Sequence, residues 1–296
     1  DADWNQELNR INFKIDSSVD LANLIALYTT DNRLREIVFY STPNISAEGF
    51  LDLEELGKFK DFQFPGEVIG EVQTEKFGSR GQIFNSLEFG FSLAGEKMYF
   101  RNLRVDHKTG VAFLNFKYEP EMGDEAVQYQ SEIKLDPRVF RPFFKEKGRK
   151  FIDAWDFNDL STVYIAAVGR GPDLEVGKWK NEGVIDIRNF RLNGVEFQQL
   201  EADLESDQQF VWFRNVIMAR EEGKILAELA QSDLTTSQWE VKGVVSNTDL
   251  IEGARAFSPK LAQSLSAYRL TSPPTIKLHG TIDGRRPEEV GDSPRK

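Results

Sequence analysis

The sequence predicts a mainly β protein of the α+β class, in which antiparallel meanders form a curved, elongated sheet or groove and short helical pairs interrupt them. Three observations lead to this prediction. Apolar and polar residues alternate in many short runs, the turns between those runs contain few residues, and the whole pattern returns after 113 positions. Alternation with a period of two is typical of strands, and short turns require antiparallel neighbours.

The internal repeat relates residues 70–144 to residues 183–257, with twelve identities in 75 ungapped positions. This is roughly three times the chance rate of about 6% that average residue usage sets. The spacing is too long for a solenoid coil, so the repeated unit is a small supersecondary assembly used about twice. The identical pairs are Gly70/Gly183, Phe77/Phe190, Gly81/Gly194, Phe84/Phe197, Leu87/Leu200, Glu88/Glu201, Phe100/Phe213, Arg101/Arg214, Asn102/Asn215, Gly110/Gly223, Asp136/Asp249 and Phe144/Phe257.

The first part of the chain is expected to contain a strand, two helices and another strand. Residues 10–16 alternate as a strand does, and residues 19–28 show helical spacing. A second short helix is expected at residues 32–39. An extended segment at residues 41–52, marked by a proline and a glycine, follows it.

Two meanders of five strands each are expected after this part. Few residues separate the strands of each meander, so consecutive strands should pair as neighbours. The first meander is expected at residues 67–75, 82–93, 97–105, 111–118 and 126–135, and the second at residues 184–192, 195–204, 210–219, 224–230 and 239–246.

Each meander ends at an aspartate that is expected to cap a helix. Asp136 precedes a proline in the first helical position, and Asp249 precedes a helix that is broken at Pro259. A closing strand is expected after each helical pair, at residues 161–169 and 272–283.

These elements divide the chain into four parts. Residues 1–65 form the strand-helix-strand part, residues 66–175 the first repeat with its meander and helical pair, and residues 176–283 the second repeat. Residues 284–296 are charged and rich in glycine and proline, which is typical of a tail.

Residues two apart in a strand share a face, so each meander should have one apolar and one polar side. Glu88 and Ser92 mark the polar side of the first meander. Too few helical residues are expected to cover both apolar sides, so we predict a hydrophobic ligand groove. The alternative is that the two apolar stripes face each other in a dry sandwich core. The predicted groove residues are Leu87, Phe89, Phe91, Leu93, Leu200, Ala202 and Leu204.

The composition narrows the class of partner. Hydrophobic residues make up 40% of the 296 residues, which suffices for a folded core, and the net charge is -11. This charge opposes non-specific binding to nucleic acid and to anionic lipid headgroups, so neither is expected as a default partner. The chain has no cysteine, which excludes disulfides and thiolate metal sites. It contains no apolar run long enough to cross a membrane.

No pattern of catalytic or metal-binding residues stands out. The two histidines, His107 and His279, lack zinc-site spacing and are interpreted as a surface turn residue and an ordinary strand residue. The alternating Asp203, Glu205 and Asp207 lack the glycine and closing glutamate of a calcium loop. We therefore expect no metal, no cofactor and no enzymatic activity.

A glycine-punctuated meander that follows a helical pair and a proline- and glycine-bearing strand is typical of one family. GVIDIRNFRLNGVEFQQLEADL, residues 183–204, carries the pattern, and WEVKGVVSNTDL from Trp239 and SPPTIKLHGTID from Ser272 suit it. In these features the chain resembles the C-terminal region of the AsmA-like family, the group that includes AsmA, TamB and YhdP. The resemblance is best over residues 176–283 and looser in the first repeat.

The resemblance implies a Gram-negative envelope protein in the periplasm, anchored in a membrane by a segment outside this chain. It also implies a curled sheet whose hydrophobic groove carries phospholipid acyl chains in outer-membrane biogenesis. The expected function is therefore lipid binding or lipid transport without bond making, with lipid as the partner. The alternative is a structural or protein-interaction module of the envelope, with a closed core and no ligand.

Overall fold

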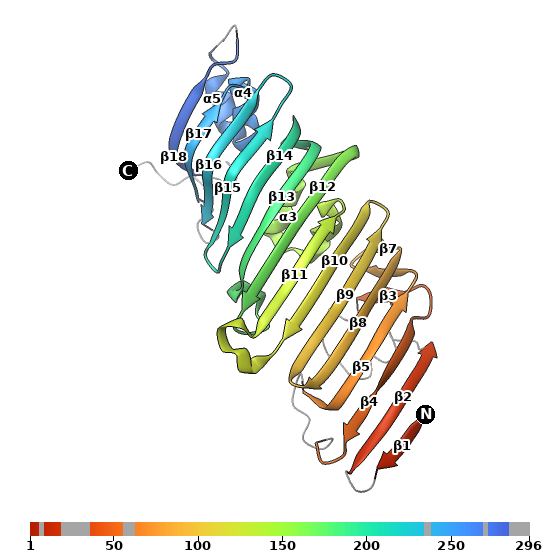
Figure 1. Ribbon diagram of the computed structural model, residues 1–296. Helices are drawn as coiled ribbons and strands as arrows, with labels where there is room; N and C mark the ends of the chain where they lie inside the picture. The colour runs from red at the N-terminus through yellow and green to blue at the C-terminus, as the bar shows by residue number, and fades with distance from the viewer. Residues whose placement is uncertain (6–8, 19–35, 56–62, 234–237, 269–271, 284–296) are drawn as a thin grey trace. The chain divides into compact units, whose positions relative to one another are not determined.

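The computed structural model describes residues 1–5, 9–18, 36–55, 63–233, 238–268 and 272–283. The predicted fold class is confirmed, because the described residues are mainly β and form a large, open antiparallel sheet of fifteen strands (Figure 1). Neighbours in this sheet follow one another along the chain, as a meander requires, except that β3, β6 and β7 leave it to form a small sheet of their own.

The strands of the large sheet, in hydrogen-bonded order, are β1 (Ala2–Asn5), β2 (Arg10–Ser18), β4 (Asn44–Asp52), β5 (Phe64–Thr74), β8 (Ser86–Gly95), β9 (Lys97–His107), β10 (Gly110–Tyr118), β11 (Val127–Lys134), β12 (Trp155–Gly171), β13 (Lys180–Leu192), β14 (Val195–Ser206), β15 (Phe210–Ala219), β16 (Lys224–Asp233), β17 (Gln238–Ser246) and β18 (Ile276–Asp283). The small sheet consists of β3 (Ile37–Phe39), β6 (Phe77–Ser79) and β7 (Gln82–Phe84).

The described helices are short. The 3-10 helices are η1 (Pro120–Glu125), η2 (Pro137–Phe143) and η3 (Val176–Lys178), and the α-helices are α3 (Glu146–Asp153), α4 (Leu250–Phe257) and α5 (Pro259–Leu265). Within the described ranges, every helix is too short or too polar to cross a bilayer.

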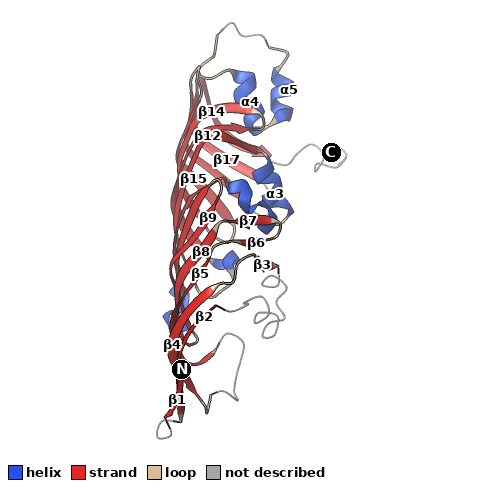
Figure 2. Cartoon of the chain, turned by 90° about the vertical axis from the view of Figure 1, so that its right-hand side faces the viewer, coloured by secondary structure: helices blue, strands red, loops and turns tan. Residues whose placement is uncertain are grey.

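The chain divides into two compact units. Unit 1 comprises residues 1–135 and 168–178, and unit 2 comprises residues 136–167 and 179–296. In unit 1 the small sheet lies on one side of the large sheet's strands, and in unit 2 the helices α3, α4 and α5 lie together on one side of theirs (Figure 2). Each unit therefore has one face that is partly covered.

The repeat is visible in the structure as matching hairpins. Phe77 of β6 pairs with Phe84 of β7, and their rings stack with centroids 4.8 Å apart. At the positions 113 residues later, Phe190 of β13 pairs with Phe197 of β14, and the stacked rings are 5.4 Å apart. The hairpin in unit 1 belongs to the small sheet, whereas its counterpart continues the strands of the large sheet.

The turns of these hairpins also match. Arg80 and Gly81 have φ of 49° and 80°, and Asn193 and Gly194 have φ of 48° and 78°. Two consecutive residues with positive φ form the turn that best fits the twist of a two-residue hairpin, and glycine and asparagine adopt it readily. The repeat is therefore a repeat of backbone conformation as well as of residue type.

The core of unit 2 lies between its strands and its helices. Phe190 is 2% exposed, and its ring lies 5.2 Å from that of Trp155. Ala256 of α4 belongs to the same buried cluster, together with Leu200 and Met218 of β14 and β15. Burial of these side chains fixes α4 against the sheet.

The turn between β13 and β14 is held by both helical pairs. The Asn193 backbone N–H donates to the Ala154 carbonyl at 2.7 Å, at the end of α3. The Asn193 side-chain amide donates to the Ala256 carbonyl of α4, also at 2.7 Å. Asn193 thus ties the hairpin to two helices that are about a hundred residues apart in sequence.

The structure corrects several sequence expectations. The single strand expected at 82–93 is two strands, β7 and β8, which are interrupted at Asn85, and β7 pairs with β6 instead of continuing in the large sheet. The helix expected at 32–39 is wrong at its end, because Ile37–Phe39 is the strand β3. Residues 32–35 of that segment and the whole helix expected at 19–28 lie outside the described residues.

The other expected strands are confirmed, most with small shifts of their ends, but β12 begins at Trp155, six residues before the expected start, and β18 begins at Ile276, four residues after it. The aspartate caps are confirmed too. The Asp136 carboxylate accepts a hydrogen bond from the Arg138 backbone N–H at the start of η2, and the Asp249 carboxylate accepts two at the start of α4. Such bonds satisfy amide groups that have no partner within the helix.

Candidate functional site

Unit 1 has one apolar face, at whose centre four phenylalanines lie on neighbouring strands. Phe89 and Phe91 belong to β8, Phe100 to β9 and Phe116 to β10. The Phe89 ring centroid lies 6.2 Å from that of Phe91 and 5.7 Å from that of Phe100. The Phe100 and Phe116 centroids are 6.0 Å apart. We call these four residues the aromatic row.

All four rings of the aromatic row are partly exposed. Among the described residues of unit 1, the small sheet covers one end of the face, where Phe77, Phe84 and His107 are buried against one another. Away from this covered end, neighbouring rings contact one another in tilted or edge-to-face arrangements along the sheet. The row therefore combines a fixed position with accessible aromatic surface.

The close approach of one ring depends on a glycine. A Cβ atom at Gly70 of β5 would lie 2.8 Å from Cζ of Phe91 and 2.5 Å from the Ser46 carbonyl oxygen. Any larger residue at this position would displace the ring or the backbone of β4. Glycine inside a strand often marks a site where another group approaches the backbone closely, and here it lets the Phe91 ring pack against the backbone of β5.

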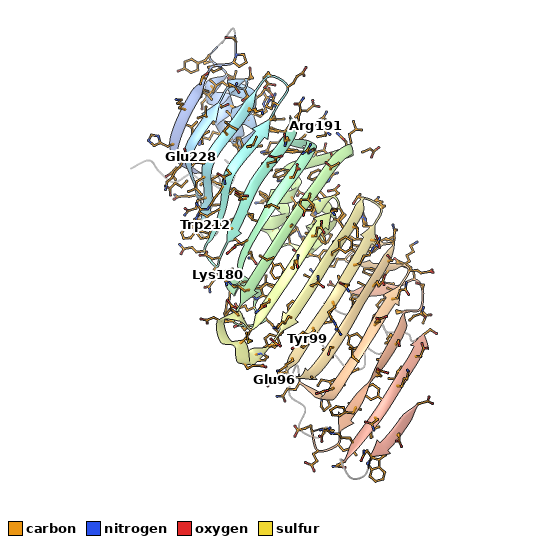
Figure 3. The ribbon with its side chains drawn as sticks, viewed as in Figure 1. Glu96, Tyr99, Lys180, Arg191, Trp212 and Glu228 are labelled. Atoms are coloured by element: carbon orange, nitrogen blue, oxygen red, sulfur yellow. The ribbon has the colours of Figure 1, made fainter. Side chains whose placement is uncertain are left out.

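The opposite face of unit 1 is polar. Arg104 donates from Nε and Nη2 to the two carboxylate oxygens of Asp106, both at 2.9 Å, and Ser86 donates to the same carboxylate at 2.7 Å. These bonds lower the pKa of Asp106. On the same face, Tyr99, which is labelled in Figure 3, donates to Glu119, and this bond raises the pKa of the Tyr99 phenol. Hydrogen-bonded polar side chains therefore make this face hydrophilic.

The first predicted stripe lies where the sequence placed it. Leu87, Phe89, Phe91 and Leu93 share one face of β8 and are each partly exposed. Their partners on β5 and β9 lie on the same face, as the pairing of Leu93 with Met98 illustrates. The structure therefore joins this stripe to the aromatic row.

The second predicted stripe belongs to unit 2 and is mostly covered. Leu200 and Ala202 are 7% and 6% exposed, and Leu200 is part of the cluster beneath the helices. Leu204, farther along β14, is partly exposed. Of these three residues, Leu204 alone offers surface to a ligand.

Three aromatic residues of the apolar faces were missed by the sequence reasoning. Phe100 and Phe116 belong to the aromatic row, and in unit 2 Phe213 stacks on Trp239 with centroids 6.0 Å apart. A backbone bulge at Asn102 shifts the alternation, so Phe100 shares a face with residues of the other parity. The identity of Phe100 and Phe213 in the repeat was the signal that pointed to them.

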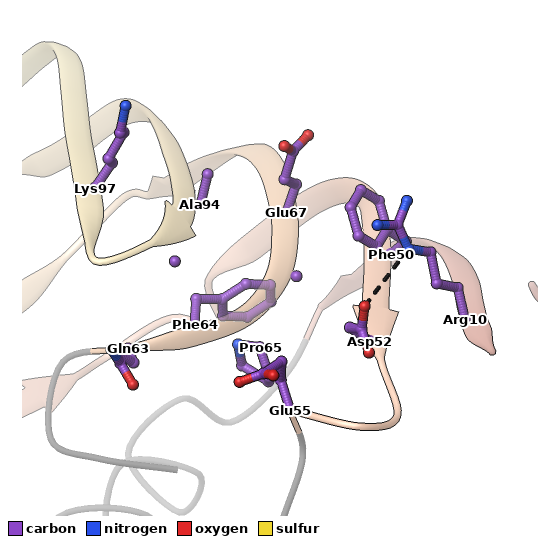
Figure 4. Close-up of a pocket in the computed structure, with 12 residues that line it drawn as sticks. Arg10, Phe50, Asp52, Glu55, Gln63, Phe64, Pro65, Glu67, Ala94 and Lys97 are labelled. Atoms are coloured by element: carbon purple, nitrogen blue, oxygen red, sulfur yellow. Dashed lines mark ion pairs between the residues drawn. The ribbon is translucent and has the colours of Figure 1, made fainter. Parts of the chain in front are cut away.

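A cavity of about 460 Å³ lies elsewhere in unit 1, where β2, β4, β5 and the β8–β9 turn meet (Figure 4). Its lining is mixed in charge. Arg10 lies 3.7 Å from the Asp52 carboxylate and 4.1 Å above the Phe50 ring, and Lys97 is paired with Glu121. This cavity contains no residue of the aromatic row, and its cations are already paired.

The described residues assemble no metal site. Within the described ranges, no three His, Asp or Glu residues lie close enough together to hold a metal ion. His107 is buried beside Phe84, so its interpretation as a surface turn residue was wrong. Its Nδ1 atom is 2.9 Å from the Thr109 hydroxyl, which gives it a structural role in the turn.

No protein-family model, curated protein or solved structure matches this chain.

Proposed function

We propose that the apolar face of unit 1 binds the acyl chains of lipids, with the aromatic row at its centre, and that the protein is a non-enzymatic lipid-binding or lipid-transfer component of a cell envelope. The observation that carries this proposal is the aromatic row itself, four partly exposed rings aligned across three strands. The resemblance to the AsmA-like family supports the envelope location and a membrane anchor outside this chain.

The residues around the row favour lipid tails over headgroups. Its neighbours on the same face of β8, β9 and β10 carry no charge: Leu87, Leu93, Met98, Leu103, Val105, Ala112, Leu114 and Tyr118. Transfer of an acyl chain from water onto such a surface gains about 0.8 kcal/mol for each buried methylene. Several methylenes suffice for binding without any polar contact.

The first experiment asks whether lipid accompanies the protein. The chain is purified without detergent, extracted into organic solvent and analysed by mass spectrometry. We expect acyl lipids in an amount comparable with that of the protein. An extract without lipid would reject the proposal.

The second experiment locates the bound lipid with a matched pair of variants. Phe91→Glu places a charge in the aromatic row, whereas Ile69→Glu places the same charge on the polar face of β5, where Ile69 is 47% exposed and pairs with Ser92. We expect Phe91→Glu to lower the lipid content at least fivefold and Ile69→Glu to leave it unchanged. Circular dichroism verifies that both variants fold. Equal lipid content in the two folded variants would contradict the assignment.

The alternative is a structural or protein-interaction module without a ligand. The sealed core of unit 2 around Phe190 favours it, because that part of the sheet is already covered by helices. If this alternative holds, the organic-solvent extract should contain no lipid, and Phe91→Glu should change only the stability of the protein.

A further inference from the structure

The helical pair that follows the first meander carries positive charge in an acidic protein. Residues 137–153 contain six basic and two acidic residues, although the whole chain has a net charge of -11. The matching residues of the second repeat, 250–266, contain two basic residues and one acidic residue. The charge is therefore a property of this helical pair and not of the repeated fold.

The same helical pair exposes large aromatic side chains. Phe144 and Phe151 are 43% and 51% exposed. Phe151 belongs to α3, whereas Phe144 lies just before the helix and packs against Gly148 of α3, where an added Cβ would lie 2.9 Å from Cβ of Phe144. Ile152, next in the chain, is buried and anchors the helix in unit 2. Phe151 is thus exposed on an anchored helix, and Phe144 is exposed just before that helix begins.

Basic side chains lie around these rings. Arg149 donates from Nε to the Phe144 carbonyl at 2.9 Å and from Nη2 to the Pro142 carbonyl at 3.4 Å. Because these partners are backbone carbonyls, they hold the guanidinium beside Phe144 without neutralising its charge. Lys145 is exposed at the start of α3. Figure 2 shows α3 on the side of the unit 2 strands that also carries α4 and α5.

We propose that this surface, defined by Phe144, Lys145, Arg149 and Phe151, docks the protein on an anionic lipid bilayer. Interfacial helices combine aromatic side chains, which enter the headgroup region, with lysine and arginine, which contact phosphates. The negative charge of the remaining surface repels the same bilayer, so this surface sets the orientation of the bound protein. This surface belongs to unit 2, and its docking on a bilayer does not depend on acyl-chain binding by unit 1.

The test measures co-sedimentation of the full chain with vesicles. One set of vesicles contains phosphatidylcholine alone, and the other contains an equal mixture of phosphatidylcholine and phosphatidylglycerol. We expect binding to the mixed vesicles that is at least tenfold tighter and that weakens in about 1 M salt, where charges are screened beyond about 3 Å. No binding to either set, or equal binding to both, overturns the proposal.

Variants then assign the binding to the helical pair. Lys145→Gln with Arg149→Gln removes two charges and keeps donors for the backbone carbonyls, and Phe144→Ser with Phe151→Ser removes the rings. Each of these two double substitutions should weaken binding to the mixed vesicles about tenfold or more. The matched control, Lys242→Gln with Lys277→Gln on β17 and β18, removes the same charge and should bind as the unsubstituted chain does.

Two further outcomes separate this proposal from others. Phe91→Glu in unit 1 should bind mixed vesicles normally, which keeps the vesicle assay distinct from the lipid-extraction assay. Soluble polyglutamate serves as an acidic protein-like competitor. If it binds as tightly as the vesicles and the phenylalanine substitutions have no effect, the surface fits an acidic protein and the bilayer proposal fails. Vesicle binding that both helix variants retain would also overturn it.

Discussion

Asn102 and Asn215, which are 113 positions apart, hold the same left-handed backbone conformation, with φ of 52° and 51°. Each lies at a bulge, where the pairing of β8 with β9 and of β14 with β15 shifts by one residue. The bulge reverses the alternation of the strand, so that Phe100 and Phe213 turn toward the apolar faces of their units. A repeated backbone irregularity thus positions the aromatic residues of both units.

Because asparagine tolerates the left-handed region and β-branched residues do not, Asn102→Val should destabilise unit 1 by about 1–2 kcal/mol. The variant Asn102→Gly keeps the conformation accessible and serves as the control. Urea unfolding followed by circular dichroism measures both. Equal midpoints for the two variants would show that the bulge does not depend on this residue.

Phe190 is expected to be among the most sensitive positions of unit 2. Its ring stacks on those of Trp155 and Phe197 inside the core. Phe190→Ala removes this packing and leaves a cavity, which should cost about 3–5 kcal/mol of unfolding free energy. Leu160→Ala, at a side chain that is 76% exposed, is the control and should change stability little. Differential scanning calorimetry compares the two, and a small loss for Phe190→Ala contradicts the core assignment.

The cap of α4 offers a smaller, local test. The Asp249 carboxylate accepts hydrogen bonds from the backbone N–H groups of Ile251 at 3.0 Å and Glu252 at 2.9 Å. Asp249→Ala should lower the unfolding free energy by about 1 kcal/mol, whereas Asp249→Asn retains an acceptor and should lower it less. Thermal unfolding at neutral pH separates the variants. If both lose the same stability, the cap hydrogen bonds are not the cause.

The lowered pKa of Asp106 predicts that the stability of the fold depends on pH. Hydrogen bonds from Arg104 and Ser86 lower its pKa below the ordinary value of 3.8. A carboxyl group whose pKa is lower in the folded state stabilises the fold above its unfolded pKa, and this stability is lost as the pH falls through the folded pKa. The urea concentration at the unfolding midpoint should therefore decrease as the pH is lowered below about 4.

The variant Asp106→Asn isolates this contribution, because it keeps an acceptor and cannot ionise. Its urea midpoint should be lower than that of the unsubstituted chain at pH 7, and the difference should shrink as the pH falls from about 4 toward 2. Parallel pH profiles for the two proteins would show that the Asp106 ion pair does not contribute.

The order of strands was predictable because its signals are local. Alternation in 97–105 and 111–118 marks β9 and β10, and the short turn between them makes them antiparallel neighbours. The separation of β6 and β7 from the large sheet was not predictable, since it depends on the tertiary contacts that bury Phe77 and Phe84. The wrong helix at Ile37–Phe39 has the same origin, because pairing with β6 decides its conformation.

The candidate site was predictable in part. Alternation placed Phe89 and Phe91 on one apolar face, but it missed Phe100, which a bulge turns toward that face. The charge of residues 137–153 can be counted in the sequence, whereas the exposure of Phe144 and Phe151 cannot. Which side of a short helix meets solvent depends on the surface against which the helix packs.

Leu87 and Leu200 occupy the same position of the repeat, on the apolar side of matching strands. The local pattern of residues determined by itself that both belong to strands and that both point to an apolar side, because strand alternation and turn chemistry act over a few residues. The tertiary structure decided that Leu200 is buried under helices while Leu87 stays partly exposed. The covering of a sheet depends on contacts between segments far apart in the chain, and no local pattern records them.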